Sequence, residues 1–220
     1  RIKPGPRPLI VPLEVAEALR QEFTCEGCGC RWSSLGSSFF CPACGDNSAA
    51  VMFDRTVETV RQLIVHLPII TRGFPDSDTA EDALRHIMED QLCRLVAAFE
   101  RLGETLSESV PLAKRAPKKG NIFQRLDDAS NWWHLSVGLG YDSWLQPAEL
   151  ARLRVFYQRR HLLVHRQGMV DQAYLDKSGD PAYQSSQRIV VRADDVSELA
   201  DLLVRLAAGL RIAIRPAGTL

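Results

Sequence analysis

The sequence lacks a net charge, because its 27 lysines and arginines balance 27 aspartates and glutamates over 220 residues. No overall positive field therefore attracts nucleic acid, and any contact with RNA must come from a local basic patch. The sequence also lacks an apolar run close to the ~20 residues that a membrane-spanning helix needs. The longest such run lies near residues 62–70, so we expect no contact with a membrane.

Cysteine is scarce, with six residues in the chain, and no signal-peptide pattern opens the sequence. Four of the six stand in pairs at C-x2-C spacing. This arrangement indicates a metal site in a reducing compartment rather than a disulfide framework, and we expect a cytoplasmic protein. The sequence starts at Arg1 without a methionine, which leads us to expect a piece of a longer protein.

The composition is that of an ordinary globular protein, with 45% hydrophobic and 25% charged residues. The length suffices for one good core and a small additional module. We expect a mainly α protein, a helical bundle preceded by a small β zinc ribbon. The expected divisions are an extension with a short helix (1–23, the helix from residue 11), the ribbon (24–47), a connecting helix (48–77) and a helical domain (78–214).

Two cysteine pairs, Cys25-x2-Cys28 and Cys41-x2-Cys44, are separated by twelve residues. A glycine follows each pair, which is typical of a knuckle that aims two thiolates at one ion. Four sulfurs form the closed tetrahedral set of structural Zn²⁺, with no open position for a reacting water, so we assign this site no catalysis. Cys30 is either a spare thiol or an alternative ligand to Cys28. The ribbon could contact nucleic acid through Arg31 and Trp32, but because it has no dense basic cluster we expect a scaffold or a protein contact.

Apolar residues recur at helical spacing in five segments. The expected helices are 54–67, 80–102, a third from Asn121 to Gly138, a central one from Pro147 to Gly168, and a last one capped by Asp194 or Asp195. Residues 187–192 alternate weakly and predict a short strand.

A basic loop with two prolines spans residues 111–120 and includes Lys118 and Lys119. It is either a solvated linker or a contact for an RNA backbone.

The central helix carries Arg160, His161 and His165 within an otherwise apolar pattern. The two histidines share a face, whereas Arg160 and His165 lie about 140° apart at 100° per residue. If two copies of the helix met about a twofold axis, each arginine would reach the other copy's histidine. We therefore expect a homodimer with the site at its interface.

The segment Arg160-His-Leu-Leu-Val-His165 resembles the R-x(4–6)-H signature of HEPN domains (higher eukaryotes and prokaryotes nucleotide-binding), with a polar residue directly after the arginine. The neighbouring segments 121–126, 168–175 and 179–181 resemble these domains as well. The chain looks like HEPN members of uncharacterised bacterial proteins, some of them linked to defence, over roughly residues 78–214.

The resemblance implies a metal-independent endoribonuclease that acts in phage defence or as a toxin. A histidine takes the proton from a ribose 2′-hydroxyl, whose oxygen attacks the adjacent phosphorus. His165 is the main candidate for this role, and His161 is the secondary candidate. Arg160 stabilises the charge that develops on the phosphoryl oxygens. The expected contacts to the RNA backbone come from other basic residues, namely Arg154, Arg159, Arg166, Lys118 and Lys119. A regulatory partner or a further region would restrain such an enzyme.

Other functions stay open. An inactive HEPN relative would bind RNA or serve as a dimerisation module, and a dominant ribbon would make the chain a transcription or assembly factor. His161 and His165 also form an H-x3-H pair that could bind a metal, but no acidic residue stands between them. The arginine and histidine could also be a simple surface or interface pair.

Overall fold

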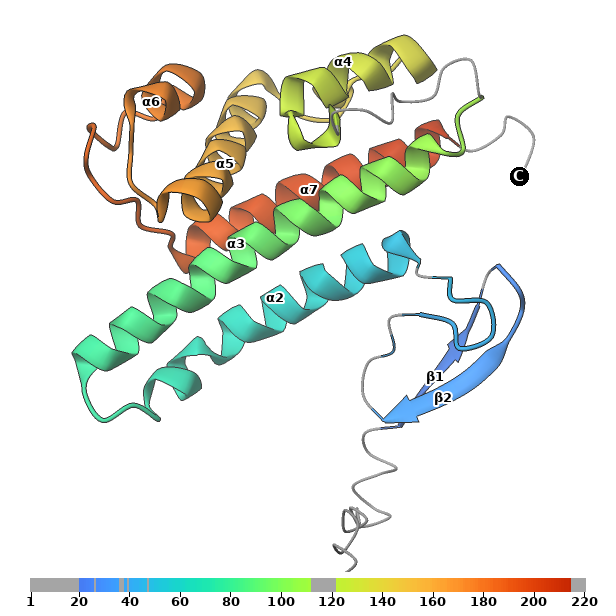
Figure 1. Ribbon diagram of the computed structural model, residues 1–220, viewed down its shortest axis with the longest axis horizontal. Coiled ribbons are helices and arrows are strands. Elements are labelled where there is room, and N and C mark those ends of the chain that lie inside the picture. The colour runs from blue at the N-terminus through green and yellow to red at the C-terminus, as the bar shows by residue number, and fades with distance from the viewer. Residues whose placement is uncertain are drawn as a thin grey trace, which may run out of the picture. The chain divides into compact units, whose positions relative to one another are not determined.

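The computed structural model describes residues 20–25, 27–35, 38, 40–46, 48–111 and 122–214 (Figure 1). The chain divides into two compact units, with the boundary between Ser48 and Ala49. The described residues are mainly helical, and a small two-stranded sheet lies near a cysteine cluster. This arrangement confirms the expected fold class. None of the described helices is both long enough and apolar enough to cross a membrane.

The first unit contains an antiparallel hairpin. Strand β1 (Arg20–Thr24) pairs with β2 (Arg31–Leu35), and the rings of Phe23 and Trp32 stack across it with centroids 5.3 Å apart. The prediction of a helix up to Phe23 is therefore wrong for residues 20–23, because cross-strand pairing and ring stacking favour an extended backbone there. Residues 11–19 of that helix lie outside the described residues.

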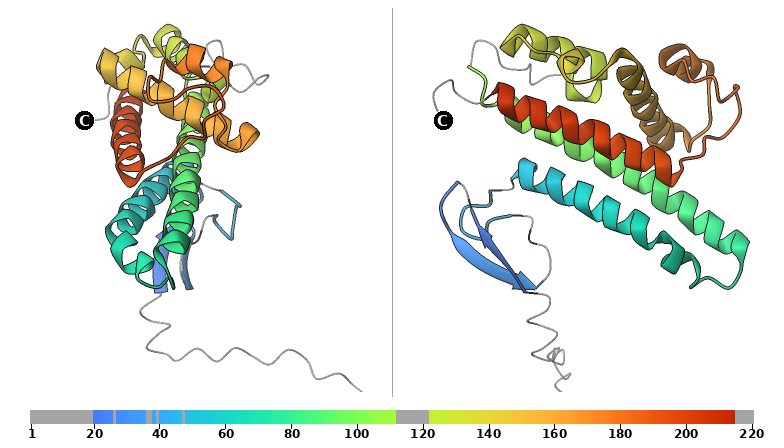
Figure 2. Two further views of the ribbon diagram at one scale, coloured as in Figure 1. Left: turned by 90° about the vertical axis from the view of Figure 1, so that its left-hand side faces the viewer. Right: turned by 180° about the vertical axis from the view of Figure 1, so that it is seen from behind.

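The second unit is a helical bundle. Its helices are α2 (Ala49–Thr71), α3 (Ser77–Ser107), α4 (Leu126–Val137), α5 (Pro147–Arg166), α6 (Gln172–Ser178) and α7 (Ala193–Ala213), with 3₁₀ turns η2 (Ile122–Gln124) and η3 (Tyr141–Ser143). The long helices α2, α3 and α7 pack on one another (Figure 1). Helices α4, α5 and α6 lie on the side of α3 away from α2 (Figure 2).

The core of the bundle forms where the apolar stripes of the long helices meet. The large apolar side chains of α7 that are fully buried are those of Val196, Leu199, Leu203, Leu206 and Leu210. They face a stripe on α3 that is also buried, namely Leu92, Leu95, Val96, Phe99 and Leu102. Each such side chain stabilises the fold by about 1.5–3 kcal/mol relative to exposure, so these stripes hold α3 as a rigid support beneath α5.

Two glycines inside helices serve close packing. We expected Gly103 to end its helix, but α3 continues to Ser107. A Cβ atom at Gly103 would lie 2.9 Å from the ring of Phe123, and one at Gly209 in α7 would lie 2.4 Å from the ring of Trp144. These glycines allow aromatic rings to lie directly on the helix backbone, which is why they interrupt the apolar pattern without ending the helix.

Local capping residues define the start of α3 and both ends of α5. Asp76 caps α3 by accepting a hydrogen bond from the Thr79 backbone N–H at 2.8 Å. Helix α5 starts at Pro147, and its end is fixed by left-handed residues at Gln167 and Gly168. Helix α4 also ends as expected, since Gly138 is left-handed. The expected cap Asn121 lies outside the described residues.

The segment after α5 differs more from expectation. Residues 187–192 form no strand, and their pairing is limited to a single bridge between Met169 and Arg188. Helix α7 is capped at Arg192, and Asp195 acts from the third helical position by accepting the Arg192 backbone N–H at 2.9 Å. The expectation that Asp194 or Asp195 is itself the cap is therefore wrong. The sequence also gave no sign of α6, which is too short to show a helical period.

Candidate functional site

The three residues of the Arg-His motif line one open cavity of about 790 Å³ on the bundle, which we call the α5 cavity. Arg160, His161 and His165 all belong to α5, and α4 contributes its first turn to the opposite wall. Lys177 of α6 adds a positive charge. The structure thus brings together the predicted catalytic residues, within a single chain, at a place that solvent reaches.

The two histidines of the cavity lie ring to ring. The centroids of His161 and His165 are 4.7 Å apart with 50° between the ring planes, and both residues are exposed. Partial burial lowers the pKa of His161, and the positive charges of His165, Lys177 and Arg160 lower it further. A neutral His161 ring has one nitrogen that can accept a proton, and the second ring lies directly beside it.

Arg160 reaches the cavity wall from α5 and contacts one carboxylate beneath it. Its Nη2 atom lies 3.5 Å from Oε2 of Glu100 on α3, and its side chain is 21% exposed. Burial raises the pKa of Glu100 to about 7, although Arg160 opposes the rise and Glu104 adds to it. The guanidinium is therefore held loosely and stays accessible from the cavity.

Tyr157 completes the polar wall. It lines the cavity, yet the residue is 6% exposed, and burial raises its pKa well above the usual value. Its hydroxyl stays protonated near neutrality. Tyr157 lies one turn before His161, so helical spacing could have identified it. Lys177 and Glu100 come from other elements, and the sequence alone gave no signal for them.

The arginines expected to hold RNA have different surroundings. Arg154 lines the cavity, with Nη2 2.7 Å from an Asp127 carboxylate oxygen. The side chain of Arg166 is 65% exposed, 3.8 Å from Asp171, and it is not among the residues that line the cavity. Lys118 and Lys119 lie outside the described residues.

Arg159 faces the interior. Its guanidinium lies 3.0 Å from Asp180 and 3.3 Å from Asp195, and the side chain is 6% exposed. The Tyr174 hydroxyl donates to the same Asp180 oxygen at 2.6 Å. One residue is a 100° step on a helix, so Arg159 points inward where Arg160 points out. The expected contact between Arg159 and RNA is therefore wrong for this fold.

The second site is the cysteine cluster. The sulfur atoms of Cys25, Cys28, Cys41 and Cys44 all lie within 4.8 Å of one another. The Cys25–Cys44 and Cys28–Cys41 separations are 3.7 and 3.6 Å. Sulfurs at ~2.3 Å from a central ion in a tetrahedron lie about 3.8 Å apart, so these four could hold one metal ion.

The backbone explains why the sulfurs converge. The Gly29 N–H donates to the Cys25 carbonyl at 2.9 Å, and the Gly45 N–H donates to the Cys41 carbonyl at 2.8 Å. Both glycines are left-handed, with φ of 71° and 73°. The two loops are thus copies of one turn, as the knuckle prediction required. Cys30 is not one of the four clustered residues.

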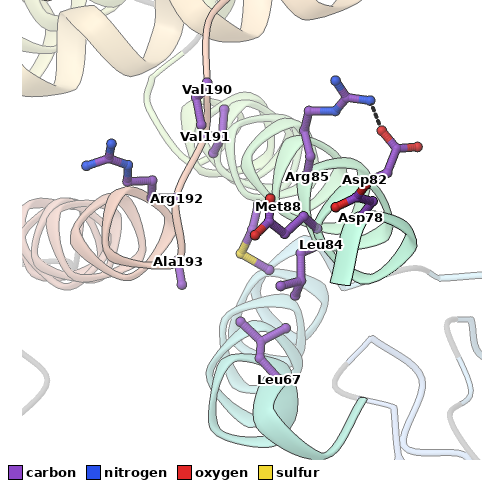
Figure 3. Close-up of a pocket in the computed structure, with 11 residues that line it drawn as sticks. Leu67, Asp78, Asp82, Leu84, Arg85, Met88, Val190, Val191, Arg192 and Ala193 are labelled. Atoms are coloured by element: carbon purple, nitrogen blue, oxygen red, sulfur yellow. Dashed lines mark hydrogen bonds and ion pairs between the residues drawn. The ribbon is translucent and has the colours of Figure 1, made fainter. Parts of the chain in front are cut away.

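A further cavity of about 580 Å³ lies between α2, α3 and the start of α7 (Figure 3). Leu67, Leu84 and Met88 form an apolar wall, and exposed carboxylates from the first turns of α3 stand at its rim. Asp82 is paired there with Arg85. None of the predicted site residues that the structure describes lines this second cavity.

Comparison with known proteins found no family model, no curated protein and no solved structure that matches the chain. The relation to HEPN domains therefore stays a prediction from the motif and its neighbouring segments.

Proposed function

We propose that the chain is a metal-independent endoribonuclease of the HEPN type, whose α5 cavity binds single-stranded RNA and cleaves it with the help of a second copy. The observation that carries the proposal is the convergence of Arg160, His161 and His165 on one open cavity. A base, an acid and a fixed positive charge are what phosphodiester cleavage by an internal hydroxyl requires.

The reaction begins with proton transfer from the ribose 2′-hydroxyl. The lowered pKa of His161 favours a neutral ring near pH 7, which supports this residue as the base. The 2′-oxygen attacks the adjacent phosphorus, and the bond from phosphorus to the 5′-oxygen breaks. His165 of either copy protonates this leaving oxygen. The products are a 2′,3′-cyclic phosphate and a 5′-hydroxyl.

Arg160 acts on the phosphate itself. Negative charge grows on the phosphoryl oxygens in the transition state, and the guanidinium stays protonated and offers paired donors. Among the described residues Arg160 forms one ion pair, with Glu100 at 3.5 Å, which is longer than a strong charge-assisted hydrogen bond. Removal of such a donor lowers turnover by roughly a hundredfold to a thousandfold.

A homodimer is part of the proposal because the cavity of one copy is broad, and a second copy would bring further catalytic groups to the same phosphate. Val164, which stands just before His165, is apolar and 54% exposed beside the motif. A second copy that covers this side chain would bring its own α5 next to the first. Sedimentation of the purified chain gives the oligomeric state, and a strict monomer would contradict this part of the proposal.

We also propose that the cysteine cluster holds a structural Zn²⁺. Four thiolates at tetrahedral spacing fill the coordination sphere, so the ion would stabilise the fold of the first unit and leave no position for a reacting water. The reaction at α5 would then proceed in the presence of a chelator.

The test is RNA cleavage with EDTA in the buffer, with circular dichroism to confirm that the bundle stays folded. We expect Arg160→Ala and His165→Ala to lose activity by at least about a hundredfold. The matched controls are Arg94→Ala and His86→Ala, which replace an exposed arginine and an exposed histidine of α3. If the controls lose activity equally, or if wild-type cleavage requires added metal, the proposal fails.

A catalytically inactive module that binds RNA or forms dimers is the second candidate. It is favoured by the ion pairs of Arg154 with Asp127 and of Arg160 with Glu100, which reduce the positive charge offered to phosphate. Binding of RNA that depends on Arg160, without cleavage by any variant, would support this candidate over the nuclease.

A further inference from the structure

Glu100 stands out among the buried acidic residues of the described chain. It is 6% exposed, and its Oε1 atom has no hydrogen-bond partner. Its other oxygen contacts Arg160 at 3.5 Å. A buried carboxylate normally accepts several hydrogen bonds, because each unsatisfied oxygen costs free energy. Such a residue calls for an explanation beyond packing.

The other buried carboxylates show what a structural role looks like. Glu89 receives both guanidinium nitrogens of Arg188, at 2.6 and 3.0 Å. Asp180 accepts from Arg159 and from the Tyr174 hydroxyl. In these pairs each charge is matched by short bonds from fixed donors. Glu100 has only one long contact, and its partner is a residue that lines the α5 cavity.

The groups around Glu100 explain its charge. Glu104 follows it on α3, Arg160 and Tyr157 face it from α5, and Tyr141 faces it from η3. Burial raises the pKa of Glu100 to about 7, against the effect of Arg160 and with a smaller rise from Glu104. Burial also raises the pKa of both tyrosines, so they stay neutral near pH 7. Glu100 is thus the member of this group that changes charge near neutrality.

We infer that Glu100 is a positioning residue for the proposed RNA site: when ionised it holds the Arg160 guanidinium against α3, and when protonated it releases this guanidinium to a phosphate of single-stranded RNA. The inference rests on the proposed function, since it concerns how that site meets its phosphate. Its consequence is that RNA binding takes up a proton, because a phosphate that draws Arg160 away leaves Glu100 without its counter-charge.

The experiment measures affinity for a fluorescein-labelled octanucleotide in which every 2′-hydroxyl is methylated, so that binding is seen without cleavage. Fluorescence anisotropy compares wild type with Glu100→Gln at pH 6 and pH 8. With a pKa of about 7, about one wild-type molecule in ten has a neutral Glu100 at pH 8, so the variant should bind up to about tenfold more tightly. At pH 6 the two proteins should agree within about twofold. The two proteins have the same histidines in the cavity, so the contribution of the histidines to binding cancels in the ratio.

Glu104→Gln is the matched control, because Glu104 is a glutamate one turn along α3 that pairs with Arg101 instead of Arg160. Glu104→Gln should not bind the octanucleotide more tightly than wild type at either pH, because loss of Glu104 lowers the pKa of Glu100 and reduces its neutral fraction. If Glu100→Gln loses the wild-type circular dichroism, Glu100→Met replaces it, since methionine fills a similar volume without charge.

Arg160→Ala separates the inference from the proposed function. If wild-type binding depends on Arg160 but Glu100→Gln binds no more tightly at pH 8, the inference is overturned and the RNA site stands. If Arg160→Ala binds the octanucleotide as well as wild type, the RNA site itself is wrong. The inference and the RNA site are both supported if Glu100→Gln binds more tightly at pH 8 and the double variant Glu100→Gln with Arg160→Ala loses this gain.

Discussion

Replacement of Arg159 by methionine should destabilise the bundle strongly. The change removes the positive charge that lies between Asp180 and Asp195, while it keeps much of the apolar stem. Loss of one partner of a buried ion pair costs about 3–5 kcal/mol, because the remaining charge stays buried without compensation. The cost here should lie near the lower end. Asp180 keeps the Tyr174 hydroxyl and the Ala182 backbone N–H, and Asp195 keeps Arg152.

A loss of about 3 kcal/mol corresponds to a fall in melting temperature of roughly 6–12 °C for a domain of this size. Thermal unfolding followed by far-UV circular dichroism measures it. Arg166→Met is the control on the same helix, because its side chain is 65% exposed and its pair with Asp171 is 3.8 Å long. Surface pairs of this kind contribute about 0–1 kcal/mol.

The double variant Arg159→Met with Asp180→Asn tests whether the cost arises from the stranded charge. The asparagine removes one uncompensated carboxylate, so the double variant should recover part of the stability lost in Arg159→Met. A melting temperature of Arg159→Met equal to wild type, together with weaker RNA binding, would refute the reasoning and restore Arg159 as an RNA contact.

Two further predictions concern the first unit and the packing of α7. Wild type should contain one equivalent of zinc per chain, measured by atomic emission, and Cys41→Ser or prolonged chelation should remove it. The helical circular dichroism signal of the bundle should remain. Zinc bound at full stoichiometry by Cys41→Ser would contradict the assigned ligands. Gly209→Ala should lower the melting temperature although alanine favours a helix by about 1 kcal/mol, because its Cβ would lie 2.4 Å from the Trp144 ring. An unchanged or higher melting temperature would mean that the ring moves aside freely.

The parts of the fold that the sequence predicted depend on local patterns. The periodicity of α3 and α7 is set by residues within each helix, and the C-x2-C pairs with their glycines form their turns without help from distant segments. The face shared by His161 and His165 also follows from spacing along one helix. These features could be read from the sequence because their cause lies within a few residues.

The parts that could not be predicted depend on contacts between distant residues. Gly103 looks like a helix end until Phe123, from another element, is seen to lie on it. Arg159 looks like an RNA contact until the orientation of α5 turns it toward Asp180. Lys177 of α6 lines the α5 cavity and Glu100 of α3 contacts Arg160, and no pattern near the motif points to either residue.

The orientation of α5 relates stability and the proposed function to each other. Arg159 faces inward to carboxylates that are matched by short bonds, which fixes the rotation of the helix. The same rotation sends Arg160 toward the cavity, where its carboxylate partner is matched poorly. Because both arginines belong to one helix, we expect that a variant that weakens the Arg159 ion pairs also shifts Arg160 and lowers the affinity of the proposed RNA site for phosphate.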